Sequence, residues 1–245
     1  MKKLLSVAIC ASAVAAFGTE VPVELGEVGV TAITSSTTNT IVAVSYTDLE
    51  SGNITASNLV KTANLTGGDR LYVYSGSDGK SFKAFELDAS GAVKYWKPLT
   101  VVEPAEASGV SFTTTDSADG VRIPVCTGVW LIRGSNWNGS SFTFYVYGKP
   151  VASYAATSIA ASTSALVGNP TTSDKAPAFT VGPNVGDMIV IPDNTVTGTK
   201  VWKYSQNKAG TQTKWTCGMT TQDNVTIPAG TGFWYVATGA VTFNW

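Results

Sequence analysis

The feature that most constrains the fold of this 245-residue chain is that it repeats itself. The clearest match sets Arg122–Trp130 against Thr226–Trp234, where Ile-Pro-x-x-Thr-Gly-x-Trp occurs in both copies. Further blocks match in the same order: Asn39–Val44 with Thr163–Gly168, Gly68–Val73 with Gly186–Ile191, Ala84–Leu87 with Val201–Tyr204, Lys94–Tyr95 with Lys214–Trp215, and Phe142–Phe144 with Val241–Phe243. Such self-similarity predicts two related structural units.

Each repeated block has the composition of a β-strand. Leu71–Tyr74 and Phe142–Tyr147 are rich in aromatic and β-branched residues, and turn-forming clusters such as Asn136–Gly139 separate the blocks. We therefore predict an all-β fold of two tandem, sequence-related β-sandwich or barrel-like units, with little helix apart from the N-terminus. The first unit is expected at residues 19–149 and the second at residues 150–245, with Val151–Ser164 supplying the linker and the first strand of the second copy.

The N-terminus has the layout of a secretory signal peptide. Lys2 and Lys3 precede the apolar run Leu4–Ala16, which ends in small residues. This run is shorter than the roughly 20 residues that a membrane-spanning helix needs. We predict a signal peptide at residues 1–18, a final location outside the cell, on its surface or in the periplasm, and no transmembrane helix in the mature chain.

Composition excludes several functions. The chain has no His, which excludes a Ser-His-Asp triad and His-ligated zinc. It has 16 Lys+Arg and 17 Asp+Glu, so removing Lys2 and Lys3 leaves 16 − 2 = 14 basic against 17 acidic residues, or about −3. That charge does not favour nucleic acid as a partner. Asp69 and Asp187 recur after Gly at a strand start, so we expect them to bond turn backbone. We predict no catalytic residues, no metal and no cofactor.

The repeated motif suggests structural roles for its residues. Pro lacks an N–H and suits a strand entry or edge, Gly suits a bend or bulge, and Trp suits the core. A pair of exposed, sugar-stacking tryptophans is the alternative. The predicted structural repeat comprises Ile123, Pro124, Gly128 and Trp130 with their counterparts Ile227, Pro228, Gly232 and Trp234.

Two further features are not shared between the two copies of the repeat. Trp137 lies in a turn with no counterpart in the second copy, so Asn136, Trp137 and Asn138 are the candidate contact for a surface glycan or another envelope protein, with ordinary turn packing as the alternative. Cys126 and Cys217 enter an oxidising compartment if the chain is exported, and either one disulfide or two buried thiols is compatible with their positions.

The stretches Val60–Tyr74 and Ile227–Trp234 resemble a group of exported bacterial proteins of unknown function. Members of that group carry a signal peptide and a β-rich body with a late I/L-P-x-G-x-G-F-W-like strand. The resemblance implies a surface or envelope location and transfers no catalytic residue.

These observations favour an exported, non-enzymatic β protein that is a structural or interaction component of the cell surface, envelope or extracellular matrix. A pair of carbohydrate-binding modules is the first alternative. A small outer-membrane β-barrel is the second, because Val241, Phe243 and Trp245 alternate up to an aromatic C-terminus. Most of the expected strands are shorter than the roughly 9–11 residues of membrane-spanning strands.

Overall fold

The computed structural model describes residues 29–36, 39–47, 54–60, 65–74, 81–91, 93–99, 111–113, 117–139, 141–192 and 198–245. The expected signal peptide at residues 1–18 lies outside these ranges. The first unit contains β1 (Gly29–Ser35), β2 (Asn39–Ala43), β3 (Tyr46–Thr47), β4 (Ile54–Thr55), the 3-10 turn η1 (Ala56–Val60), β5 (Arg70–Tyr74), β6 (Ser81–Asp88), β7 (Tyr95–Pro98), β8 (Ser111–Thr113), η2 (Ala118–Gly120), β9 (Arg122–Ile123), β10 (Gly128–Ile132) and β11 (Phe142–Pro150). The second contains β12 (Thr157–Ile159), β13 (Ser164–Gly168), β14 (Ala178–Val181), β15 (Met188–Pro192), β16 (Thr199–Gln206), β17 (Thr213–Cys217), β18 (Thr220–Gln222), β19 (Gly232–Val236) and β20 (Val241–Asn244).

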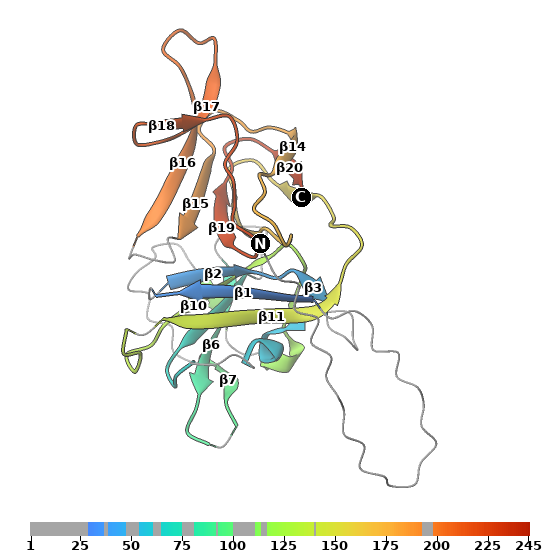
Figure 1. Cartoon of the computed structure of the whole chain (residues 1–245), viewed down its shortest axis with the longest axis vertical. Helices are drawn as coiled ribbons and strands as arrows, with labels where there is room; N and C mark the ends of the chain where they lie inside the picture. Colours follow the sequence, from blue (N-terminus) through green and yellow to red (C-terminus); the bar gives the residue numbers. More distant parts are fainter. Residues whose placement is uncertain are drawn as a thin grey trace.

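The two units share one sheet architecture, which confirms the predicted all-β fold of two sandwich-like units. In the first, a sheet of order β2-β10-β5-β6-β7 accompanies a three-stranded sheet of order β1-β11-β3. In the second, the orders are β13-β19-β15-β16-β17-β18 and β12-β20-β14. Figure 1 shows the first unit below and the second above, with β16 and β17 extending away from the first unit. The segment Val151–Ser164 holds β12, the first strand of the second unit, and its last residue begins β13.

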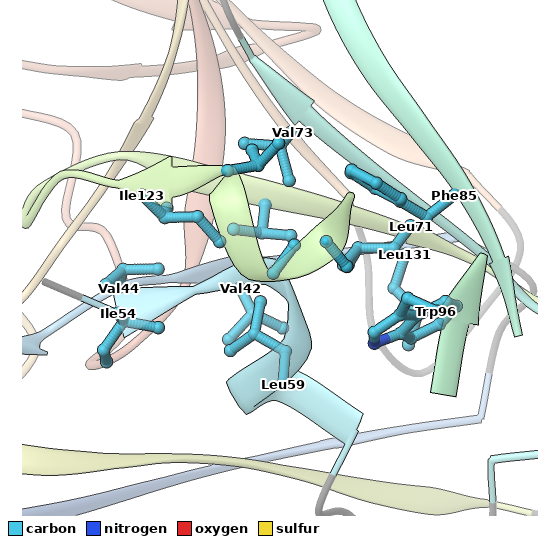
Figure 2. Packing of buried hydrophobic residues seen from close by; sticks show 14 of the residues in the cluster. Val42, Val44, Ile54, Leu59, Leu71, Val73, Phe85, Trp96, Ile123 and Leu131 are labelled. Atoms are coloured by element: carbon cyan, nitrogen blue, oxygen red, sulfur yellow. The ribbon is translucent and has the colours of Figure 1, made fainter. Parts of the chain in front are cut away.

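Each unit has its own core against its large sheet, and in the first unit the two-stranded sheet of β4 and β9 contributes Ile54 and Ile123 to that core. In β10, Val129 and Leu131 point into the first core, where Figure 2 shows Leu131 close to Leu71 and Trp96. Strand alternation explains this pattern, because successive side chains of a strand face opposite sides of the sheet. In the second unit the equivalent inward positions of β19 are Phe233 and Tyr235, which pack with β20.

The structure corrects the sequence match of β7 to β17 by one residue. Trp96 lies opposite Leu87, and Trp215 lies opposite Tyr204 at the equivalent place in the second unit. The buried Trp96 is thus the counterpart of the buried Trp215, whereas the sequence match gave that place to Tyr95. Tyr95 and Trp96 are both aromatic, so composition alone could not show which of them faces the core.

The match of β2 to β13 needs the same correction. Val42 lies opposite Val129, and Val167 lies opposite Phe233, so Val42 corresponds to Val167 and not to Leu166. A shift of one residue still aligns apolar residues with apolar residues, although it exchanges the two faces of the strand.

The two units meet at an interface to which both contribute equivalent residues of the repeat. Thr127 forms a β-bridge with Val167, and Val42 forms the equivalent bridge with Thr231. Backbone hydrogen bonds repeat this exchange, since Gly168 N donates to the Cys126 carbonyl at 2.9 Å and Ala43 N donates to the Gly230 carbonyl at 2.8 Å. Equivalent residues contact each other reciprocally, as in the isologous interface of a two-fold symmetric dimer. We call this region the junction.

The repeated tryptophans lie at the junction and not in the cores of their units. Trp130 and Trp234 are half-buried and pack against a separate cluster that contains Ile41 and Leu166. Phe82 is within ring contact of both, at centroid distances of 6.4 Å and 5.6 Å. The expectation that they enter the core of each unit is therefore wrong, because the inward face of β10 and β19 is taken by their neighbours.

The repeated glycines allow the close approach. A Cβ on Gly128 would come within 2.8 Å of the Leu166 side chain, and one on Gly232 within 2.2 Å of the Ile41 Cγ2. Both glycines begin regularly paired strands, so the prediction that they lie at a bend or bulge is wrong. Their lack of a side chain instead lets the two units come close together.

Candidate functional site

A buried carboxylate stands at the start of β5 and of β15, where Asp69 and Asp187 were expected to bond turn backbone. Asp69 accepts hydrogen bonds from Thr66 N and Gly134 N, both at 2.8 Å. Asp187 accepts from Asn184 N at 2.8 Å and from Thr238 N at 2.7 Å, which are the equivalent positions. Each carboxylate therefore ties its own turn to the loop that follows β10 or β19, as the sequence predicted.

The partners of the two carboxylates differ in chemistry. Arg133 Nε donates to Asp69 Oδ1 at 3.0 Å in an ion pair whose side chains are 1% and 0% exposed. In the second unit, Ala237 takes the place of Arg133, and the Tyr235 hydroxyl donates to Asp187 Oδ2 at 2.8 Å. Burial, followed by the neighbouring Asp187 carboxylate, raises the pKa of Tyr235, so this phenol stays a donor.

The pH dependence of stability follows from the Asp187 carboxyl. Burial alone would raise its pKa, but the hydrogen bonds from Asn184, Thr238 and Tyr235 outweigh burial and hold the pKa below its usual 3.8. Because the folded pKa is depressed, this contribution to stability is present above the unfolded value and is lost as pH falls through the folded one. We expect the denaturant concentration at the midpoint of unfolding to decrease once the pH is lowered below about 4. In Asp187→Asn, this midpoint should depend less steeply on pH. An unchanged slope in that variant would contradict this.

The candidate binding residues lie directly over the ion pair of the first unit. Trp137 is half-buried, and the Arg133 guanidinium carbon is 5.5 Å from the centre of its ring. Asn136 Nδ2 donates to the Gly67 carbonyl at 2.8 Å, which fixes the loop against the Asp69 turn. Asn136 and Asn138 are exposed. The structure thus brings the three residues together at one edge of the first unit, with Trp137 covering Arg133.

A second candidate site, which the sequence did not indicate, lies beside the repeated motif. In both units the motif forms a turn in which Thr N donates to the Pro carbonyl, at 3.2 Å for Thr127 and 3.1 Å for Thr231. The third residue of this turn is left-handed, with φ of 71° at Cys126 and 69° at Gly230. A cavity of about 340 Å³ opens beside the turn of the first unit, between Cys126, Tyr46 and the linker residue Tyr154.

Cys126 and Cys217 are free thiols in different units. Cys126 lies in the turn beside this cavity, and Cys217 ends β17. The predicted alternative of a disulfide between Cys126 and Cys217 is therefore wrong for this structure. The alternative of two buried thiols is nearer, although each cysteine is only partly buried. Burial raises the pKa of Cys126 to about 11, which keeps this thiol protonated at neutral pH.

No family model, curated protein or solved structure matches the chain. The resemblance of Val60–Tyr74 and Ile227–Trp234 to exported bacterial proteins therefore stays a prediction. Within the ranges that the structure describes, no helix is long and apolar enough to span a membrane.

One signal for the cavity was present in the sequence. Cys126 occupies the position at which the second copy of the motif has Gly230, and a non-glycine residue with a left-handed backbone is uncommon. That this position requires a left-handed backbone is apparent only from the structure of the turn. The linker wall of the cavity lies outside the matched blocks of the repeat, so the repeat itself could not reveal it.

Proposed function

We propose that this chain is an exported, non-enzymatic β protein that serves as a structural or interaction component of a cell surface, envelope or extracellular matrix. The single observation that carries the proposal is the junction. The residues that recur most clearly in the sequence, from Ile-Pro to Trp, are those that build the turn and join the two units. A duplication held together by its own repeated motif suits a rigid body with a mechanical or contact role.

The edges of the two large sheets support the same proposal. At the junction, β2 and β13 would each present unpaired backbone groups, which invite uncontrolled association. Hydrogen bonds from Ala43 N and Gly168 N to the other unit cover part of both edges. The hairpin of β16 and β17 remains as an extended, mostly polar surface, with Thr199, Lys203 and Gln206 among its exposed or half-exposed residues. Specific contacts with a partner are better served by such a surface than by a free sheet edge.

The export part of the proposal is tested by fractionation. The full chain with a C-terminal epitope tag is produced in a bacterial host, and the N-terminus of the recovered protein is read by mass spectrometry. We expect cleavage near residue 18 and recovery outside the cytoplasm. The matched control is Val7→Arg, which interrupts the apolar run and should leave an uncleaved, cytoplasmic chain. Retention of the unaltered chain in the cytoplasm with its N-terminus intact would overturn the proposal.

A carbohydrate-binding role is the second candidate, and the exposed amides beside Trp137 are the observation in its favour. A sugar stacked on the indole could also bond Asn138, because aromatic faces and amides are common in recognition sites. The mature chain is screened on a glycan array, where Trp137→Ala should abolish binding. It should also cost about 0.5–2 kcal/mol of stability through the lost cation–π contact. Met219→Ala, at a fully exposed side chain, is the control. Glycan binding that survives Trp137→Ala would exclude this platform.

A further inference from the structure

The cavity beside the motif turn has a closed, apolar end and an open end. Tyr46, Ile54 and Ile123 line it and are nearly fully buried, at 4%, 2% and 1% exposure. Ser153 and Ala155 of the linker also line it and are exposed, so they stand at its entrance. With a volume of about 340 Å³, the cavity lies within the range of small-molecule sites, roughly 300–1,000 Å³.

The described lining is uncharged. Every residue of the described ranges that lines the cavity is apolar or neutral polar, and those with polar side chains include Cys126, Ser153 and Tyr154. Burial raises the pKa of both Cys126 and Tyr154, so neither supplies a negative charge near neutral pH. A charged ligand would lose its hydration in this cavity without gaining an opposite charge, which is strongly unfavourable. A neutral ligand does not carry that penalty.

The backbone at Cys126 marks the cavity as a specialised part of the fold. Gly230 occupies the equivalent left-handed position in the second unit and makes the same backbone bonds at the junction. A side chain is unfavourable at such a position, by roughly 1–2 kcal/mol. Strain of this kind is retained where a side chain has a local role, and here Cys126 forms a wall of the cavity. The cavity is thus a feature of one unit and its linker, and not a by-product of the repeat.

We propose that this cavity is a binding site for a small, uncharged and largely apolar molecule of about two fused rings that carries one hydrogen-bond donor. The size follows from volume, since an apolar cavity of about 150 Å³ accommodates benzene. The donor follows from Tyr154, whose hydroxyl already donates to the Pro170 carbonyl at 3.1 Å and so offers its oxygen as an acceptor. This site goes beyond the proposed surface function and does not depend on it.

Calorimetric titration of the mature chain with 2-naphthol near neutral pH tests the proposal. We expect saturable binding with a dissociation constant below about 1 mM. The matched probe 2-naphthoate has the same rings but a negative charge, and it should bind at least about tenfold more weakly, which is a difference of about 1.4 kcal/mol. Absence of heat with 2-naphthol, or equal binding of both probes, would overturn the proposal.

Two further measurements place the probe in the cavity. Ala155→Trp adds a large side chain at the exposed entrance and should weaken 2-naphthol binding by at least about tenfold, whereas Ala156→Trp, at an exposed neighbour outside the lining, should not. Saturating 2-naphthol should also slow modification of Cys126 by methyl methanethiosulfonate and leave Cys217 unchanged, as read by peptide mass spectrometry. Equal weakening in both variants, or no protection of Cys126, would overturn the assignment to this cavity.

Discussion

Asp69→Ala is expected to lower the free energy of unfolding by about 3–5 kcal/mol, because removing one member of a buried ion pair leaves a buried charge facing an apolar group. The Arg133 side chain is 1% exposed and donates to Asp69 Oδ1. The same substitution also removes the acceptor of Thr66 N and Gly134 N. Urea denaturation followed by tryptophan fluorescence measures the loss.

The second unit supplies the control for this prediction. Ala237 stands where Arg133 stands in the first unit, and Asp187 is held there by neutral donors alone. Arg133→Ala should therefore cost less than Asp69→Ala, about 1–3 kcal/mol. The double variant should lose much less stability than the sum of the two single losses, since the effects of substitutions within one network are not additive. Additive losses, or a loss below about 1 kcal/mol for Asp69→Ala, would contradict the assigned role of the pair.

The fold was predictable because duplication and strand composition point the same way. The matched blocks fall on strands that take the same places in both large sheets, with β10 and β19 each second in its sheet, next to the edge strands β2 and β13. The register was less accessible, because residues on both sides of the correct match were apolar. In β7, strand pairing, the burial of Trp96 and the exposure of Tyr95 together show that Trp96 corresponds to Trp215.

The position of the repeated tryptophans could not be predicted, for a reason that lies in the geometry of sheets. The alternation of side chains assigns the residues of β10 and β19 to two faces, but it does not reveal what packs against each face. In both units one face meets the smaller sheet and the other meets the junction, so Trp130 and Trp234 have apolar surroundings on the side away from their own core. The roles of Asp69 and Asp187 were predictable, because a short carboxylate after Gly at a strand start has turn donors within reach.

The junction is expected to tolerate added volume poorly. A Cβ on Gly168 would lie 2.3 Å from the Ala43 Cβ and 2.6 Å from the Ala43 Cα. Since those atoms belong to a paired strand, they cannot move aside as the end of a long side chain can. Gly168→Ala should therefore cost about 3 kcal/mol, at the upper end of the usual range for overpacking.

Two comparisons separate steric conflict from a general effect of replacing glycine. Gly120→Ala places a Cβ where no atom lies within 4 Å, so it should be neutral or slightly stabilising. Gly232→Ala should be milder than Gly168→Ala, because its closest conflict, at 2.2 Å, is with a side-chain methyl group of Ile41. The denaturant midpoint should therefore be highest for Gly120→Ala, lower for Gly232→Ala and lowest for Gly168→Ala.

The reciprocal construction of the junction allows a compensating change. Ala43 and Gly168 are equivalent positions of β2 and β13, since they lie opposite Gly128 and Gly232. The double variant Ala43→Gly with Gly168→Ala exchanges the two residues. It removes the 2.3 Å conflict with the Ala43 Cβ and keeps the 2.6 Å approach to the Cα of residue 43, so it should recover part of the lost stability. Failure to recover would mean that the two units do not meet through equivalent strands. Recovery would support a junction in which the surfaces that join the units are the same surfaces that the repeat preserves.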